Sequence, residues 1–194
     1  NFVANFHYKL LKVFKTVSCF KFTSVTIDAQ SFNAINKIAD ATMITKEAIE
    51  LTAYNFDKYK SKKSKTSFKE ISIFVNDKKA KRTIEKAAIA TENITTSVNF
   101  AKALVDEAPN ALHSVEYAKR VEKDVKANLK GVKVKILGKA EIKKEKMGMF
   151  LSVNAGSAHD PRLVHLTYTP KKVTKNTKHI ALVGKGLTFD TGGY

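Results

Sequence analysis

The sequence is poor in cysteine and has no long apolar run, and each absence removes a class of protein. Cys19 is the only cysteine among 194 residues, so an internal disulfide framework is excluded and a reducing compartment, the cytoplasm, is expected. No apolar stretch reaches the roughly 18 residues that a membrane-spanning helix needs, so an ordinary transmembrane protein is excluded. With 43% hydrophobic and 27% charged residues, the composition is that of a globular chain with its own core.

Arginine is also scarce, which decides how the high positive charge is interpreted. Lys+Arg 35 against Asp+Glu 18 gives a net charge of +17, a value that raises the hypothesis of a nucleic-acid or anionic-membrane partner. Arg82, Arg120 and Arg162 are the only arginines, and specific recognition of bases or phosphates usually depends on the bidentate guanidinium group. The lysines are spread along the whole chain, so we interpret most of them as solvated surface charge. We therefore do not expect a nucleic-acid partner.

The spacing of apolar residues predicts an α/β fold, in which strands come first. Apolar and polar residues alternate in three stretches of the first half, which predicts strands over 12–17, 22–27 and 71–75. Apolar residues recur at helical spacing from 31 to about 59, and again over 78–107. Pro109 follows the second of these predicted helices and ends it.

The second half of the sequence continues the alternation of helices and strands. Ser114 has the residue type of a helix N-cap, and Gly131 ends the helix that follows. The predicted strands are 132–136, 163–168 and 179–183, and a short charged helix is predicted over 139–146. The apolar run over 147–153 fits no single element type. Strands that alternate with helices favour a largely parallel sheet in this half.

The chemistry of the sequence gathers in one segment that follows the last predicted strand. Residues 182–193 contain four of the eight glycines of the chain. Glycine lets the backbone turn sharply and approach a bound group closely, and ligands usually bind beyond the carboxyl ends of parallel strands. Lys185 and Asp190 are the cation and the carboxylate of this segment, and the glycines allow both to face one pocket. A salt-bridged turn after a core strand explains the same residues, so spacing alone leaves both interpretations open.

Other polar residues carry weaker signals. The histidines of the second half have no paired ligand spacing, so we expect surface or half-buried side chains at His113, His159, His165 and His179. Cys19 lies in a β-rich stretch and is expected to be a buried structural thiol. Asp106 and Glu107 are adjacent acids at the C-terminal end of a predicted helix, where the helix dipole disfavours them. Their position predicts a tertiary contact.

The glycine-rich segment resembles a known metal site. Residues 183–193, Val-Gly-Lys-Gly-Leu-Thr-Phe-Asp-Thr-Gly-Gly, resemble the start of the metal site in the cytosolic leucyl aminopeptidases, peptidase family M17. Further stretches resemble that family in order and spacing: 53–60, 99–110, 147–149, 156–158 and 161–164. The first of them is similar to the end of the family's N-terminal domain, and the second to the start of its catalytic domain. The resemblance covers residues from about 45 to 194, whereas residues 1–44 match little.

The resemblance implies an aminopeptidase that uses two divalent metal ions, Zn²⁺ or Mn²⁺, to hydrolyse N-terminal, leucine-type residues from peptides. It implies a homohexamer with a partial N-terminal α/β domain over 1–77, a linking helix over 78–107 and the truncated start of an α/β catalytic domain over 108–194. Lys185 is implied to bind one metal and Asp190 to bridge both. The chemistry agrees, because a carboxylate is a hard ligand for such ions and a lysine can bind as the free amine.

The resemblance also implies residues that this sequence lacks. In the family a catalytic lysine, an arginine and further carboxylate ligands come later, so we expect them beyond Tyr194. Two ligands do not fill a catalytic coordination sphere, so we expect a fragment that is inactive alone. Two alternatives stay open: a short product that pairs with full-length subunits, and a basic nucleic-acid-binding module. A coding frame that continues past Tyr194 would support the fragment, and an authentic stop codon would support the short product.

Overall fold

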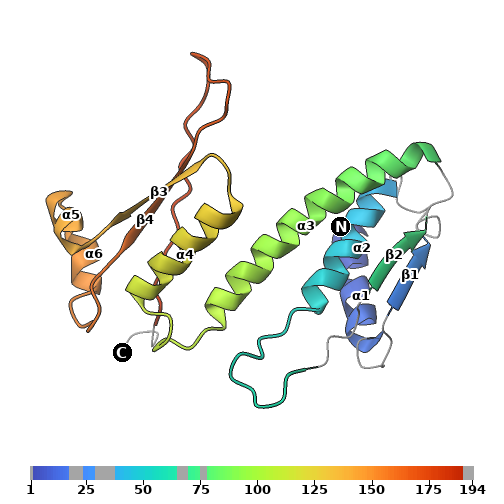
Figure 1. The fold of residues 1–194 in the computed structure, drawn as a ribbon, viewed down its shortest axis with the longest axis horizontal. Helices are drawn as coiled ribbons and strands as arrows, with labels where there is room; N and C mark the ends of the chain where they lie inside the picture. Colours follow the sequence, from blue (N-terminus) through green and yellow to red (C-terminus); the bar gives the residue numbers. More distant parts are fainter. Residues whose placement is uncertain (1, 18–23, 29–37, 65–69, 75–77, 190–194) are drawn as a thin grey trace. The chain divides into compact units, whose positions relative to one another are not determined.

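The computed structural model describes residues 2–17, 24–28, 38–64, 70–74 and 78–189 (Figure 1). The chain forms two compact units, Asn1–Asp106 and Glu107–Tyr194. Both units combine helices with paired strands, which confirms the predicted α/β class. The functional division into 1–77, 78–107 and 108–194 stays a prediction. Within the described ranges, no helix has both the length and the apolar character to cross a membrane.

Within its described residues, the first unit has two strands and three helices. Its elements are α1 (Phe2–Val17), β1 (Ser24–Asp28), α2 (Ile38–Thr52), β2 (Glu70–Phe74) and α3 (Lys78–Val105). The strands pair in parallel, from Ser24 opposite Glu70 to Asp28 opposite Phe74. Parallel neighbours need a crossover connection, and α2 lies in that connection. Figure 1 shows α2 running along α3.

Residues 12–17 belong to the helix α1, so the prediction of a strand there is wrong. The stretch alternates in polarity as a strand does, but Leu10, Leu11 and Phe14 lie together on the core that α2 forms with the two strands. Phe14 is 6% exposed and its neighbour Val13 is 52% exposed. The spacing of Leu10 and Phe14 is that of one helical face, so tertiary packing overrides the local alternation. The predicted strands over 22–27 and 71–75 are confirmed as β1 and β2 within the described residues.

Alanine and threonine make up most of the buried residues of α2 and α3. The buried residues of these two helices are Ala41, Thr42, Thr45, Ala48, Ile49, Ile84, Ala87, Thr91 and Thr95. The Thr91 hydroxyl donates to the Ala87 carbonyl at 2.9 Å, and the Thr95 hydroxyl donates to the Thr91 carbonyl at 3.1 Å. Threonines can therefore be buried here because the preceding helical turn supplies their hydrogen-bond acceptors. The predicted helix over 78–107 is confirmed as α3.

The second unit follows the predicted order of elements up to the strand over 163–168. Its elements within the described residues are α4 (Ser114–Asn128), β3 (Val132–Leu137), α5 (Lys139–Lys144), α6 (Gly148–Val153) and β4 (Leu163–Tyr168). The apolar run over 147–153, for which no element type was predicted, contains the helix α6. Gly131, with a φ of 82°, makes the left-handed turn between α4 and β3. The N-cap position of α4 is occupied by His113, whereas the Ser114 hydroxyl donates to the Asp160 carbonyl at 2.6 Å. The prediction of Ser114 as the cap is therefore wrong.

The strands β3 and β4 pair antiparallel, which differs from the largely parallel sheet that the sequence favoured in this half. Val132 lies opposite Tyr168, and Leu137 lies opposite Leu163. The connection through α5 and α6 thus leaves and re-enters the sheet at the same end, so no crossover is made. Alternation of element types does not fix strand direction. Among the described residues, the parallel pair lies in the first unit instead.

Residues 179–183 form no strand, contrary to the prediction. Ile180, Leu182 and Val183 are 83%, 95% and 97% exposed. A strand is stabilised by hydrogen bonds and side-chain pairs with its neighbours. The described part of the chain places no strand beside this apolar run, so its sequence pattern alone does not make it a strand.

Candidate metal centre

Lys185 lies in an irregular and exposed segment that follows β4. Asp190 lies outside the described residues, so the convergence of Lys185 and Asp190 on one pocket stays a prediction. The two glycines that flank Lys185 differ in their surroundings. A Cβ atom added at Gly184 would meet nothing within 4 Å, whereas one added at Gly186 would lie 3.8 Å from the ring of Tyr117. A side chain at Gly186 would therefore meet the Tyr117 ring of α4, whereas one at Gly184 would point into open space.

The side chains of Lys185 and Asp190 are suitable ligands for a divalent metal. Two ligands are too few to complete a metal site. An amine and a carboxylate are both ligands that Zn²⁺ or Mn²⁺ accepts. Among the residues that the structure describes, no group of three or more His, Cys, Asp or Glu side chains is arranged to hold a metal ion. Cys19, predicted to be a buried thiol, lies outside those residues. We therefore assign no catalytic step to the described residues alone.

The histidines are surface or half-buried side chains, as predicted. His113 is half-buried, whereas His159, His165 and His179 are exposed. His113 stacks on His159 with ring centroids 3.6 Å apart and planes inclined by 8°. Stacked rings hold their nitrogen atoms in parallel planes, so this pair does not converge on one ion.

Asp106 and Glu107 each make the tertiary contact that their position predicts. In the first unit, the Tyr54 hydroxyl donates to the Asp106 carboxylate at 2.8 Å. Burial, this hydrogen bond and the charge of Asp106 raise the pKa of Tyr54 to about 12. In the second unit, Arg120 Nη1 lies 2.6 Å from the Glu107 carboxylate, whose side chain is 1% exposed. The hydrogen bond to Glu107 raises the pKa of Arg120 above its usual value, so both carboxylates have structural partners.

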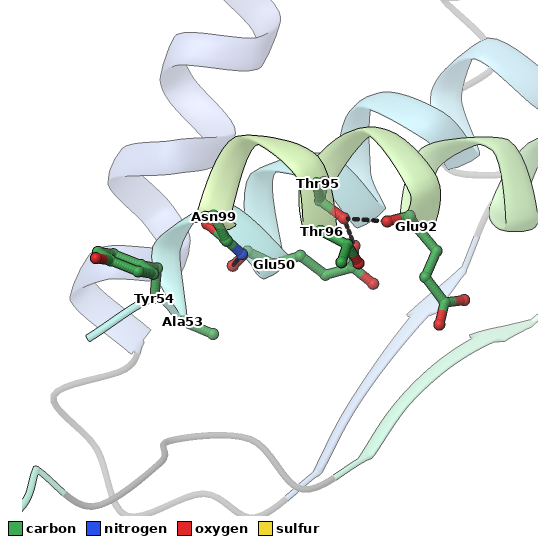
Figure 2. Close-up of a pocket in the computed structure, with 7 residues that line it drawn as sticks. All are labelled: Glu50, Ala53, Tyr54, Glu92, Thr95, Thr96 and Asn99. Carbon is green, nitrogen blue, oxygen red and sulfur yellow. Dashed lines mark hydrogen bonds between the residues drawn. The ribbon is translucent and has the colours of Figure 1, made fainter. Parts of the chain in front are cut away.

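A polar pocket of about 300 Å³ lies between α2 and α3 (Figure 2). Its lining residues are Glu50, Ala53, Tyr54, Glu92, Thr95, Thr96 and Asn99. Lys46 pairs with Glu50 and lies 4.0 Å from Glu92, and the Thr95 hydroxyl also donates to Glu50. Because Lys46 already compensates these carboxylates, the pocket is not assigned a metal. This pocket was not predicted from the sequence, where its signal was the acids Glu50 and Glu92 on two predicted helices.

The second half of the chain matches a known protein family. Residues 99–194 match the model of the cytosol aminopeptidase family, catalytic domain. The chain is 35% identical over 175 residues to the probable cytosol aminopeptidase of Sulfurihydrogenibium sp., and 36% identical over 180 residues to that of Persephonella marina. These matches cover 89% and 92% of this chain, but 33% and 35% of the two relatives. The chain therefore belongs to the cytosol aminopeptidase family, and it spans about a third of the length of these relatives.

Solved structures share the fold. A tomato leucine aminopeptidase variant has a TM-score of 0.80 at 21% identity, with 97% of this chain and 37% of that chain covered. The bottromycin maturation enzyme BotP in complex with Mn has a TM-score of 0.69 at 20% identity, with 87% of this chain and 34% of that chain covered. The arrangement of helices and strands is thus that of a leucine aminopeptidase-like α/β fold.

Proposed function

We propose that this chain supplies part of a two-metal aminopeptidase that hydrolyses N-terminal, leucine-type residues from peptides. The observation that carries the proposal is the Lys185–Asp190 motif, which lies inside the stretch matched to the family's catalytic domain. In this proposal Lys185 would hold one divalent ion through its free amine, and the Asp190 carboxylate would be shared by both ions. Bound ions of this kind supply Lewis-acid activation of the scissile carbonyl and of water. The Mn that accompanies BotP supports Mn²⁺, beside Zn²⁺, as the metal.

We also propose a compartment, an assembly and a substrate class for the enzyme. The curated relatives are named cytosol aminopeptidases, and a single cysteine suits a reducing compartment, so we propose a cytoplasmic protein. The resemblance implies a homohexamer, which we propose for the assembled enzyme. Its partners would be peptides with a free N-terminus.

The 194-residue chain alone is proposed to be inactive. A catalytic metal needs about three protein ligands and an open position, and the motif supplies two. A chimera tests this proposal: residues 1–194 are followed by the part of the Sulfurihydrogenibium sp. relative that comes after its matched region. We expect the chimera, and not the chain alone, to release leucine from a leucyl amide with added Mn²⁺ or Zn²⁺.

The matched control is the same chimera with Asp190→Ala. It should lose activity by orders of magnitude, because a ligand shared by both metals is gone. Turnover by the purified 194-residue chain would overturn its proposed inactivity. An Asp190→Ala chimera as active as its parent would overturn the role of Asp190.

A further inference from the structure

Two consecutive carboxylates stand at the boundary between the two compact units. The first unit ends at Asp106, and the second begins at Glu107. Boundaries of this kind usually fall in exposed, flexible segments that few contacts cross. Here each acid is bound to a partner of its own unit, Asp106 to Tyr54 and Glu107 to Arg120. The chain is therefore held on both sides of the boundary.

In the first unit, the end of α3 holds Asp106 against Tyr54. The Asp106 N–H donates to the Lys102 carbonyl at 2.8 Å, so the helical hydrogen bonds continue as far as Asp106. Lys102 and Asp106 are four residues apart and thus lie on one side of the helix. Lys102 Nζ lies 4.1 Å from the centroid of the Tyr54 ring, and the Tyr54 hydroxyl donates to Asp106 at 2.8 Å. The Tyr54 side chain thus connects the end of α3 to the segment that follows α2.

The contact between Tyr54 and Asp106 is exposed to solvent. Asp106 is exposed, and its neighbour Val105 is 83% exposed. A hydrogen bond between such groups competes with water, so its net contribution to stability is small. When the contact opens, water can solvate the Asp106 carboxylate, so no unpaired charge is left buried.

In the second unit, the contact of Glu107 is buried. The Glu107 side chain is 1% exposed, and Arg120 Nη1 lies 2.6 Å from one of its carboxylate oxygens. The other oxygen accepts from the Ala108 N–H at 3.3 Å, and Arg120 also donates to the Ala111 carbonyl at 3.4 Å. Separation of Arg120 from Glu107 would leave a buried charge without its partner, which is strongly unfavourable. Glu107 is thus fixed to α4 and to the turn that precedes this helix.

We propose that the boundary is a one-sided hinge: Glu107 stays fixed, and the chain opens where Tyr54 releases Asp106. Opening then frays the end of α3 and leaves the start of the second unit folded. Local openings begin where few buried contacts hold the backbone, and at this boundary that is the side of Val105 and Asp106.

The experiment compares amide hydrogen exchange in the 194-residue chain and in its Tyr54→Phe variant. The substitution removes only the hydroxyl, and the ring stays beside its lysine. We expect the amides of 105–106 to exchange about fivefold faster, as the loss of one hydrogen bond implies, and the amides over 107–112 to keep their rates. Tyr8→Phe is the matched control, because the exposed Tyr8 also lies under a lysine, with Lys12 Nζ 4.6 Å from its ring centroid. It should change none of these rates.

A second variant tests whether the Tyr54 hydroxyl acts through Asp106. Asp106→Ala removes the acceptor, so the addition of Tyr54→Phe to it should accelerate exchange at 105 no further, since both substitutions remove the same contact. An acceleration as large as in the unsubstituted background would mean that the hydroxyl acts through another partner, and would overturn the proposal. Exchange at 105–106 as slow in Tyr54→Phe as in the unsubstituted chain would also overturn it. Faster exchange over 107–112 as well would show that Glu107 is not fixed, and the hinge would not be one-sided.

Discussion

Asp57 closes the lysine-rich segment after α2 into a compact loop. Its carboxylate accepts from the Ser64 N–H at 2.5 Å and from the Ser64 hydroxyl at 3.1 Å, and it pairs with Lys60 at 2.8 Å. Lys60 and the two Ser64 donors lower the pKa of Asp57 to about 2. One acid thus organises a loop that also carries Lys58, Lys62 and Lys63.

The pH dependence of this loop follows from the direction of the pKa shift. A carboxyl group with a lowered pKa in the folded state stabilises the fold above the pKa of the unfolded chain. That contribution is lost as the pH falls from about 3.8 towards about 2. Carboxyl NMR should show Asp57 titrating near 2, and Lys60→Ala should raise its midpoint. Lys62→Ala is the control and should not move it. A midpoint near 3.8 in the unsubstituted chain would contradict the described loop.

Glu107 and Arg120 form the buried ion pair of the second unit. The Glu107 side chain is 1% exposed and the Arg120 side chain 29%, so Arg120→Ala removes the cation from a buried carboxylate. Loss of one partner of a buried pair costs about 3 kcal/mol, and urea unfolding should show a decrease of that order. Glu116 lies 3.6 Å from Arg120 and is more exposed, so Glu116→Ala should cost below about 1 kcal/mol. Equal losses in the two variants would mean that Glu107 is not the main partner.

Helices and strands with a strong periodic pattern could be predicted from the sequence. The elements that they pack against, and the direction in which strands pair, could not. The helix α3 and the strands β2, β3 and β4 follow from their own residues, because length and spacing suffice for them. The helix α1 was predicted as a strand because Phe14 shows its burial only against α2 and the sheet. The direction of β4 depends on where the chain returns after α6, which no local pattern encodes.

The candidate site was only partly accessible to prediction. Lys185 and Asp190 could be singled out because lysine and aspartate among glycines form a recognisable pattern. The proximity of Gly186 to the Tyr117 ring brings together residues about seventy positions apart in the sequence, and no periodicity links them. Which residues pair with Asp106 and Glu107 could not be predicted either. The unfavourable position of these two acids at a helix end predicted only that partners exist.

The interface of α2 with α3 allows a matched pair of substitutions. Among the described residues, the buried Thr45 hydroxyl has no hydrogen-bond partner, whereas the single Thr95 hydroxyl proton has two acceptors within reach, the Glu50 carboxylate and the Thr91 carbonyl. Thr45→Val should stabilise the first unit by about 1 kcal/mol, because it removes an unsatisfied buried group. Thr95→Val should destabilise it by about 1 kcal/mol. Thermal unfolding measures the stability change of both variants. A loss of stability in Thr45→Val would show that the Thr45 hydroxyl of the unsubstituted chain has a hydrogen-bond partner.

For the molecule as a whole, we expect the exposed apolar run over 179–183 to affect association rather than stability. Leu182 is 95% exposed, whereas Ile142 of α5 is fully buried. Leu182→Lys should therefore change the free energy of unfolding by about 0.5 kcal/mol or less, and should reduce self-association in sedimentation velocity. Ile142→Lys should unfold the second unit. A Leu182→Lys variant as unstable as Ile142→Lys would mean that residues 179–183 are packed in solution.

The metal content of the chimera tests the central proposal most directly. The purified parent should carry two divalent ions per subunit, and Asp190→Ala should weaken both, because the bridging carboxylate is lost. Lys185→Ala should lose mainly one ion, since an amine cannot bridge. Lys185→Arg should not restore it, because a guanidinium stays protonated and has no lone pair to donate. Full metal occupancy in Asp190→Ala would show that residues 183–193 form a structural turn, and would contradict the assignment of a metal site.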